Sequence, residues 1–242
     1  MLNNQQSAPA LAALITDQNG RTALHQAAAK GTLSNLSGVT AELLANVKDN
    51  DGWTPLHAAA NHSHLDQIPG LTAEFLATVK DNDGWTPLHL AADYGYLAQI
   101  PGVTAEFLAT VKDNDGLTPL HLAAEDGHLA QLPGVTAEFL ATVKDNYGET
   151  PLHVAASEGH LDQIPGVTAE LLATVKHNNG ETPLHVAAEH GHLDQIPGVT
   201  AEFLATVKHN DGWTPLHLAI ETRHLDQIGD LTIKLVQRDA SS

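Results

Sequence analysis

The sequence repeats itself with a period of 32 residues. A four-residue pattern of threonine, proline or alanine, leucine and histidine recurs seven times at this spacing, with no linker between the copies. Its threonines are Thr22, Thr54, Thr86, Thr118, Thr150, Thr182 and Thr214. A unit of this length cannot bury its own apolar face, so neighbouring copies have to stack and share a core. The period therefore predicts a single repeat domain over residues 1–242, and an estimate of domain number from chain length does not apply.

The terminal copies differ from the internal ones in the way that end caps do. We divide the chain into an N-terminal capping copy, five internal copies and a C-terminal capping copy, over residues 1–48, 49–208 and 209–242. Near the start, APALAALIT has the character of a second helix alone, Ala23 replaces the motif proline, and near the end Arg223 replaces a glycine. Polar residues suited to an exposed outer face close the chain, namely Lys234, Gln237, Arg238 and Asp239. Terminal repeats need such a face for solubility.

The first half of each copy predicts a turn followed by a helix. In the copy that begins at Asp81, the letters DNDG contain Asn and Asp, which tolerate a left-handed backbone, and Gly84, which adopts a positive φ at little cost. Thr86 suits the N-cap position, and Pro87 suits the first helical position because its missing N–H would have no partner there. The helix runs on through LHLAA and is expected to end at Gly95.

The second half of each copy predicts a single turn and a second helix. Pro101 cannot lie inside a continuous helix without losing a hydrogen bond and clashing with the preceding turn. We therefore expect LAQI to form one turn of 3₁₀ type, and a helix to restart after Thr104 over AEFLATV. Helical spacing places four residues of this copy in the core, namely Val103, Phe107, Leu108 and Val111. The four phenylalanines share one repeat position and are all expected in the core: Phe75, Phe107, Phe139 and Phe203.

The charge balance restricts the kinds of partner. The chain has 29 acidic and 11 basic residues, for a formal net charge of −18. Such a charge repels phosphate backbones and anionic lipids, so we expect neither nucleic acid nor membrane as a partner, whereas a basic protein surface would be attracted. The absence of cysteine excludes disulfides and fits a reducing cytosol. With no apolar run of membrane-spanning length and no basic start like that of a signal peptide, we expect a cytoplasmic protein, or a secreted bacterial effector in a host's cytosol.

Sixteen histidines raise the question of catalysis or metal binding. Seven belong to the repeated motif, and five more begin the segment after the first helix. Two H-x-H pairs, His62 with His64 and His190 with His192, lack the further ligands and second shell of a stable metal site. The DNDG turns lack the closing glutamate of a calcium loop. Since no nucleophile motif or phosphate-binding glycine loop occurs either, we expect no enzyme, no cofactor and no metal.

The stretch DNDGWTPLHLAA, followed by GH in three of the copies, resembles the ankyrin repeat over nearly the whole chain. The resemblance implies an all-α solenoid of stacked helix pairs, with β-turns or short hairpins projecting as fingers. It also implies a concave face, made by the fingers and the first helices, that binds a partner protein. The motif histidines would be structural, with hydrogen bonds within and between repeats. The chain departs from the family in a period one residue shorter than is common, and in a proline within the second half, at Pro69, Pro101, Pro133, Pro165 and Pro197.

Two positions differ between copies while the rest recur. The residue after the turn glycine runs Arg21, Trp53, Trp85, Leu117, Glu149, Glu181 and Trp213. The pair that ends the first helix includes Asn61–His62, Asp93–Tyr94 and Glu125–Asp126. In ankyrin-like solenoids these positions line the concave face. We therefore predict that the partner binds Trp53, Trp85, Leu117, Tyr94, Asn61, His62, Asp93, Glu125, Asp126, Glu149, Glu181 and Trp213.

Trp53, Trp85 and Leu117 would form an apolar stripe, continued by the acidic Glu149 and Glu181. Such a surface fits a monomer that binds a partner segment with apolar residues beside Lys or Arg. Three alternatives stay open from the sequence. In the first, each tryptophan only packs over its own turn. In the second, the varied positions have drifted neutrally. In the third, the chain is a structural or engineered scaffold without a natural ligand.

Overall fold

The computed structural model describes residues 16–228. It divides into two compact units, Met1–Pro119 and Leu120–Ser242, which we call unit 1 and unit 2 and describe separately. The expected second helix in APALAALIT and the polar end at Lys234, Gln237, Arg238 and Asp239 lie outside the described residues.

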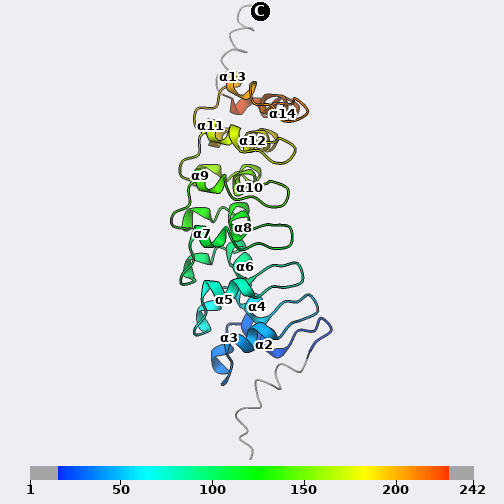
Figure 1. The fold of residues 1–242 in the computed structure, drawn as a ribbon, viewed down its shortest axis with the longest axis vertical. Helices are drawn as coiled ribbons and strands as arrows, with labels where there is room; N and C mark the ends of the chain where they lie inside the picture. The colour runs from blue at the N-terminus through cyan, green and yellow to red at the C-terminus, as the bar shows by residue number, and fades with distance from the viewer. Residues whose placement is uncertain (1–15, 229–242) are drawn as a thin grey trace, which may run out of the picture. The chain divides into compact units, whose positions relative to one another are not determined.

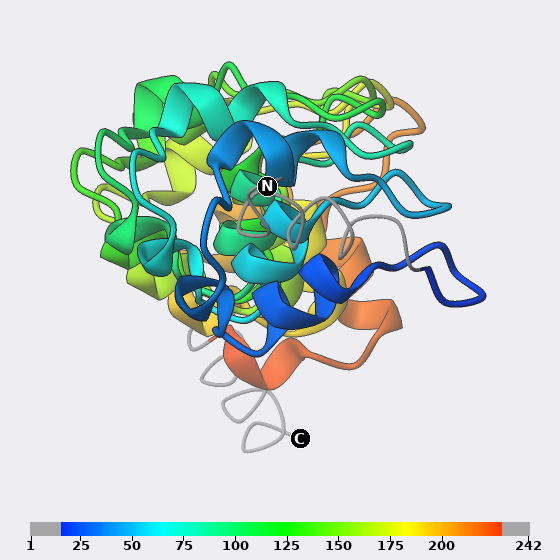
Figure 2. The ribbon, with the colours of Figure 1, turned by 90° about the horizontal axis from the view of Figure 1, so that it is seen from below.

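Unit 1 is a stack of helix pairs, coloured blue to green in Figure 1. Its first helices are α2 (Ala23–Ala29), α4 (Pro55–Asn61) and α6 (Pro87–Asp93), and α4 packs against both α2 and α6. A 3₁₀ turn follows each of them, η1 (Leu33–Asn35), η2 (Leu65–Gln67) and η3 (Leu97–Gln99). The second helices are α3 (Ala41–Asn46), α5 (Ala73–Thr78) and α7 (Ala105–Leu108). Figure 2 shows the turns before the first helices projecting from the same side of this unit.

Unit 2 has the same order of elements. Its first helices are α8 (Pro119–Glu125, which begins at the last residue of unit 1), α10 (Pro151–Glu158), α12 (Pro183–His190) and α14 (Pro215–Glu221). The 3₁₀ turns are η4 (Leu129–Gln131), η5 (Leu161–Gln163), η6 (Leu193–Gln195) and η7 (Leu225–Gln227). The second helices are α9 (Ala137–Leu140), α11 (Ala169–Thr174) and α13 (Ala201–Leu204). Over residues 16–228 no strand forms, apart from an isolated bridge between Thr16 and Thr22, so the all-α prediction is confirmed and the fingers are turns.

The turn and first helix form as the local sequence predicts. In the finger before α6, Oδ1 of Asp81 accepts hydrogen bonds from the backbone N–H of Asp83 and Trp85, at 3.0 and 2.8 Å. Gly84 lies at a φ of 85°, a conformation that favours glycine. Thr86 is the N-cap, Pro87 is the first helical residue, and the helix stops before a left-handed Gly95.

The second half of the copy follows the prediction with two corrections. The 3₁₀ turn is present, and Thr104 caps the second helix by accepting from the N–H of Phe107 at 3.2 Å. The helix itself is shorter than AEFLATV and ends at Leu108. Phe107 is half-buried rather than in the core, as are Phe75, Phe139 and Phe203, and Val103 is half-buried too. Successive helical side chains point about 100° apart, so Leu108, which is fully buried, takes the core direction and the phenylalanine lies beside it.

Candidate partner-binding surface

The repeated threonine and histidine build a rigid frame. In the third copy, Nδ1 of His89 accepts the backbone N–H of Thr86 at 3.1 Å, while Nε2 lies 3.2 Å from the carbonyl oxygen of Leu117 in the next copy. A backbone N–H can only donate and a carbonyl can only accept, so Nδ1 carries no proton and Nε2 carries one. The ring is therefore neutral in this network, and it joins two successive copies.

The same bonds recur along both units. Nε2 of the motif histidine reaches the next copy's carbonyl oxygen at 3.0–3.4 Å for His25, His57, His121, His153 and His185. We call the seven motif histidines the frame histidines. Burial lowers the pKa of His57 and of His185, and it lowers the pKa of His153 to about 4. The structural role implied for these histidines by the family resemblance is confirmed.

The carbonyl that each frame histidine holds belongs to the residue that differs between copies. Trp53, Trp85, Leu117, Glu149, Glu181 and Trp213 all accept in this way. The backbone at this position is fixed by a buried bond, while the side chain takes no part in that bond. The frame thus presents a variable side chain from a constant place.

Neighbouring fingers are also bonded to each other. The backbone N–H of Asn82 donates to the carbonyl of Asp51 at 3.0 Å, and its side-chain amide donates to the carbonyl of Asn50 at 3.2 Å. Equivalent backbone bonds join Asn50 to Asn19 and Asn114 to Asp83, both at 3.0 Å. Because the fingers are tied together, the residues on them keep a set spacing within each unit. We define the finger face as the residue after each turn glycine together with the two residues that end the first helix.

The tryptophans of unit 1 combine packing with exposure. The indole of Trp53 stacks on His57 and that of Trp85 lies against His89, with ring centroids 5.9 Å apart in both pairs. Both tryptophans and Leu117 are half-buried. Each indole therefore covers its own frame histidine, as one of the sequence alternatives holds, and still leaves part of its surface open to a partner.

The finger face is hollowed between α2 and α4. This cavity of about 130 Å³ is lined by Arg21, His25, Gln26, Ala29, Trp53, Ala58 and His62. It brings together two of the predicted binding residues, Trp53 and His62. The guanidinium of Arg21 lies 5.9 Å from the Trp53 ring centroid, and its Nε is 3.2 Å from the buried carboxylate of Asp49. Arg21 occupies the same repeat position as the tryptophans, although it is not among the predicted binding residues.

The remaining predicted residues of unit 1 lie at the ends of the first helices. Asn61 is the last residue of α4, and Nδ1 of His62 lies 3.0 Å from the carbonyl oxygen of Ala58. Asp93 ends α6 and is half-buried. Tyr94 is 45 % exposed and stacks on Tyr96, with ring centroids 6.5 Å apart. An exposed ring at this point adds an aromatic contact to the finger face.

The finger face of unit 2 is acidic. Glu149 and Glu181 are half-buried. Burial is the main cause that raises the pKa of Glu149, the carboxylates of Asp145 and Glu181 raise it further, and His177 lowers it. Partial burial, with Asp126 and Glu158 nearby, raises the pKa of Glu125 at the end of α8.

Burial is the main cause of both raised pKa values, and the neighbouring carboxylates add to it. Trp213 gives this unit its aromatic finger residue. It is 43 % exposed, with its ring 6.0 Å from that of His217.

Residues 16–228 contain no group of three or more histidine, cysteine, aspartate or glutamate side chains that could hold a metal ion. They also contain no helix that is long and apolar enough to cross a membrane.

Stacked helix pairs, capped by Thr-Pro-Leu-His and joined through histidine, define the chain as a helical repeat protein. The family model described as ankyrin repeats (3 copies) matches residues 2–73, 32–101, 100–167 and 165–231, and the chain therefore belongs to the ankyrin repeat family. Ankyrin repeats are in general modules of protein–protein interaction and are typically not enzymes. In a comparison with curated proteins, no sequence matches this chain.

Proposed function

We propose that the protein binds a partner protein through its finger face, which the family resemblance makes the concave side. The observation that carries the proposal is that, at one repeat position, the backbone is held constant while the side chain varies. A frame histidine of the preceding copy bonds the backbone of the residue after the turn glycine, and the side chain of this residue differs in chemistry between copies, from tryptophan to leucine to glutamate. A constant backbone with varied side chains is the arrangement that a recognition surface requires.

The chemistry of this face points to a partner with apolar side chains beside lysine or arginine. In unit 1 the half-exposed indoles of Trp53 and Trp85 lie next to fingers that carry exposed aspartates, such as Asp51 and Asp83. In unit 2 the carboxylates gather without an aromatic stripe. Aromatic side chains in hollows are typical anchors of interfaces, and surface charges of one sign speed the approach of the opposite sign. The proposal takes the protein as a cytoplasmic monomer with no nucleic-acid or membrane partner.

A selection from a displayed library of random peptides tests the proposal. The full chain is the bait, and we expect recovered peptides to share a consensus of aromatic or aliphatic residues next to Lys or Arg. Peptides without a shared consensus, or an acidic consensus, would contradict the proposal and favour a scaffold that has no ligand.

Matched variants locate the site for the selected peptide. Trp85→Leu puts at this position the residue that Leu117 shows to be compatible with the frame, and we expect the dissociation constant to rise about 30-fold, the effect of losing an aromatic hot spot of about 2 kcal/mol. Phe107→Leu, on the second helix, copies the residue found at Leu43 and Leu171 and serves as the control. Equal effects of the two variants would place binding elsewhere.

A further inference from the structure

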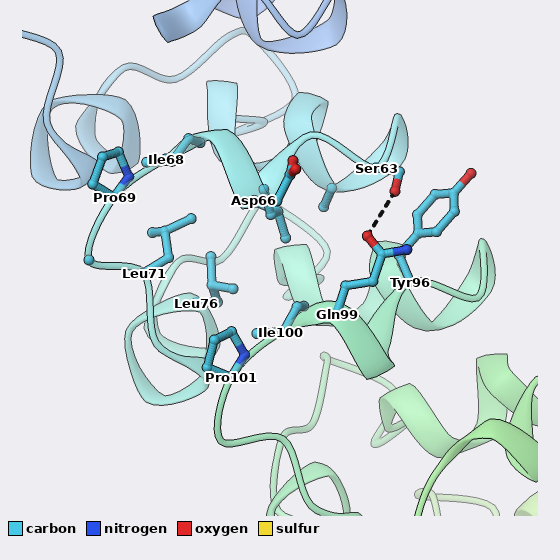
Figure 3. A pocket seen from close by; sticks show the side chains of 13 residues that line it. Ser63, Asp66, Ile68, Pro69, Leu71, Leu76, Tyr96, Gln99, Ile100 and Pro101 are labelled. Carbon is cyan, nitrogen blue, oxygen red and sulfur yellow. Dashed lines mark hydrogen bonds between the residues drawn. The ribbon is translucent and has the colours of Figure 1, made fainter.

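Unit 1 contains a second cavity, which is lined by residues outside the finger face. It has a volume of about 330 Å³ and lies between η2 and η3 (Figure 3). Its walls are Ala60, Ser63, Leu65, Asp66, Ile68, Pro69, Gly70, Leu71, Leu76, Tyr96, Gln99, Ile100 and Pro101. None of the twelve residues that we assign to partner binding lines it. A cavity of this size suits a small ligand.

The cavity lies beside a leucine that is more exposed to solvent than the equivalent leucines of other copies. The leucines that begin the other 3₁₀ turns, at Leu33, Leu97, Leu129, Leu161 and Leu193, are at most 4 % exposed. Leu65, which begins η2, is half-buried. The second and third copies therefore meet differently here from the other pairs of copies within each unit.

Two side chains account for the difference. Ser63 stands where Gly31, Gly95, Gly127, Gly159 and Gly191 stand in other copies, and Tyr96 stands where most other copies have histidine. At the junction of the fifth and sixth copies, the amide of Gln195 accepts from the N–H of Leu161 at 3.0 Å and donates to the carbonyl of Gly159 at 2.7 Å. The equivalent Gln99 instead accepts the hydroxyl of Ser63 at 3.3 Å, drawn as a dashed line in Figure 3. At the cavity the glutamine is thus bonded to a serine, whereas at this junction of unit 2 it is bonded to the backbone at and near the leucine.

Ser63 also has a strained backbone. Its φ is 61°, in the left-handed region where most other copies have glycine. Non-glycine residues in this region are uncommon, and they gather at ligand sites, where the surrounding structure holds them in place. Glycine would suit this turn better than serine does. What serine adds at the cavity is its hydroxyl group.

The two ends of the cavity differ in chemistry. Figure 3 shows Ile68, Leu71, Leu76, Ile100 and Pro101 together at one end, and Ser63, Tyr96 and Gln99 at the other, with Asp66 between them. Among the lining residues, Asp66 carries the only charge at neutral pH, and no lysine, arginine or histidine lines the cavity. The lining oxygens of Ser63, Asp66 and Gln99 accept hydrogen bonds, and a tyrosine ring attracts cations through its face.

We infer that this cavity binds a small organic cation with an apolar body, such as an arylalkylammonium ion. The ammonium group lies among the oxygens of Asp66, Gln99 and Ser63, beside the ring of Tyr96. The apolar body fills the end formed by Ile68, Leu71 and Pro101. This inference does not depend on partner binding by the finger face.

Three probes with the same phenylethyl body and different charge test the inference on the full chain: phenethylammonium, 2-phenylethanol and 3-phenylpropionate. We expect the cation to bind most tightly, the alcohol more weakly and the carboxylate weakest, in titrations followed by amide chemical shifts. The shifted amides should belong to η2, η3 and the loops after them. Binding of none of the probes, or equal binding of the cation and the carboxylate, would overturn the inference.

Variants at the cavity give the decisive comparison. Asp66→Asn should weaken phenethylammonium binding about threefold, as expected for an exposed ion pair, and leave 2-phenylethanol unchanged. Asp162→Asn, at the same position of the fifth copy, should change neither. Ser63→Gly combined with Tyr96→His restores the side chains of the other copies and should abolish binding of all probes, with thermal melts to verify folding. Unchanged binding in that double variant, or equal effects of the two aspartate variants, would also overturn the inference.

Discussion

Unit 1 and unit 2 share one frame and carry two different faces. In both, a threonine N–H meets Nδ1 of a frame histidine, as at Thr54 and Thr150, with distances of 3.1 and 3.2 Å. Yet the residue held by the histidine is an aromatic in much of unit 1 and a glutamate in much of unit 2. In both, the two ring nitrogens of histidines such as His57 and His153 are used in buried or part-buried bonds, so a change there leaves a donor unsatisfied. At the residue after the turn glycine, the frame histidine bonds only the backbone carbonyl, so the side chain can differ between copies.

Acidification should break the shared frame in both units, and this is the largest effect that we expect. His57, His153 and His185 have pKa values below the ordinary 6.5 in the folded protein, so the unfolded chain binds protons first. Stability is full above pH 6.5 and falls below it. For His153, whose folded pKa is about 4, the loss is about 1.4 kcal/mol at pH 5.5 and about 3 kcal/mol at pH 4.

Chemical denaturation at pH 7.5 and pH 5.5 measures this loss. The interval stays above the range in which most carboxyl groups titrate, and the raised pKa of Glu149 acts in the opposite direction at lower pH. Equal stability at the two pH values would mean that the histidines are not held neutral.

Replacing one frame histidine tests whether the two frames are equivalent. His57→Ala and His153→Ala should each destabilise the protein by about 3 kcal/mol, because each leaves the buried N–H of a threonine without its partner, removes the bond to the next copy and opens a cavity. His217 is exposed, and the structure shows it bonded through Nδ1 to Thr214. His217→Ala should therefore lose about 1 kcal/mol. Urea unfolding compares the free energies of unfolding of the three variants. An unchanged free energy of unfolding in His57→Ala would show that the frames of the two units are not equivalent.

The bonds between fingers can be tested at pairs of glycines. A Cβ on Gly84 would lie 2.7 Å from Oδ1 of Asn114, and one on Gly148 would lie 2.6 Å from Oδ1 of Asn178. Gly102 and Gly134 have a similar positive φ but open space around the Cβ position. Alanine should cost about 3 kcal/mol at the first two positions and about 1 kcal/mol at the second two, measured by urea unfolding. Equal costs at all four would show that neighbouring fingers do not constrain each other.

The smallest effect concerns one strained residue in each unit. Ser63 in unit 1 and Arg223 in unit 2 have φ values of 61° and 67°, where other copies have glycine. Ser63→Gly and Arg223→Gly should each stabilise the protein by about 1 kcal/mol, seen as a higher melting temperature. A loss of stability in Ser63→Gly would show that the hydroxyl bond to Gln99 outweighs the strain.

Local chemistry made the frame predictable, and packing between copies decided what was not. The turns at Gly84, the caps at Thr86 and Thr104 and the break before Pro101 depend on neighbours in sequence, and all were predicted. The half-burial of Phe107 depends on which of two adjacent residues faces the core, and helical spacing alone does not decide this. The cavity beside Leu65 requires the neighbouring copy, and the position of the Trp85 indole against His89 depends on side-chain packing. Neither could be predicted directly from the sequence, in which only Ser63 and Tyr96 are irregular.

The central claim is that varied side chains on a constant frame perform recognition. Calorimetric titration of a selected peptide into wild type and Trp85→Leu tests it most directly, with a thermal melt of each protein alongside. We predict a dissociation constant about 30-fold higher for the variant, at an almost unchanged melting temperature. Unchanged affinity would contradict the claim, because Trp85 would then serve the packing of its own turn and nothing more.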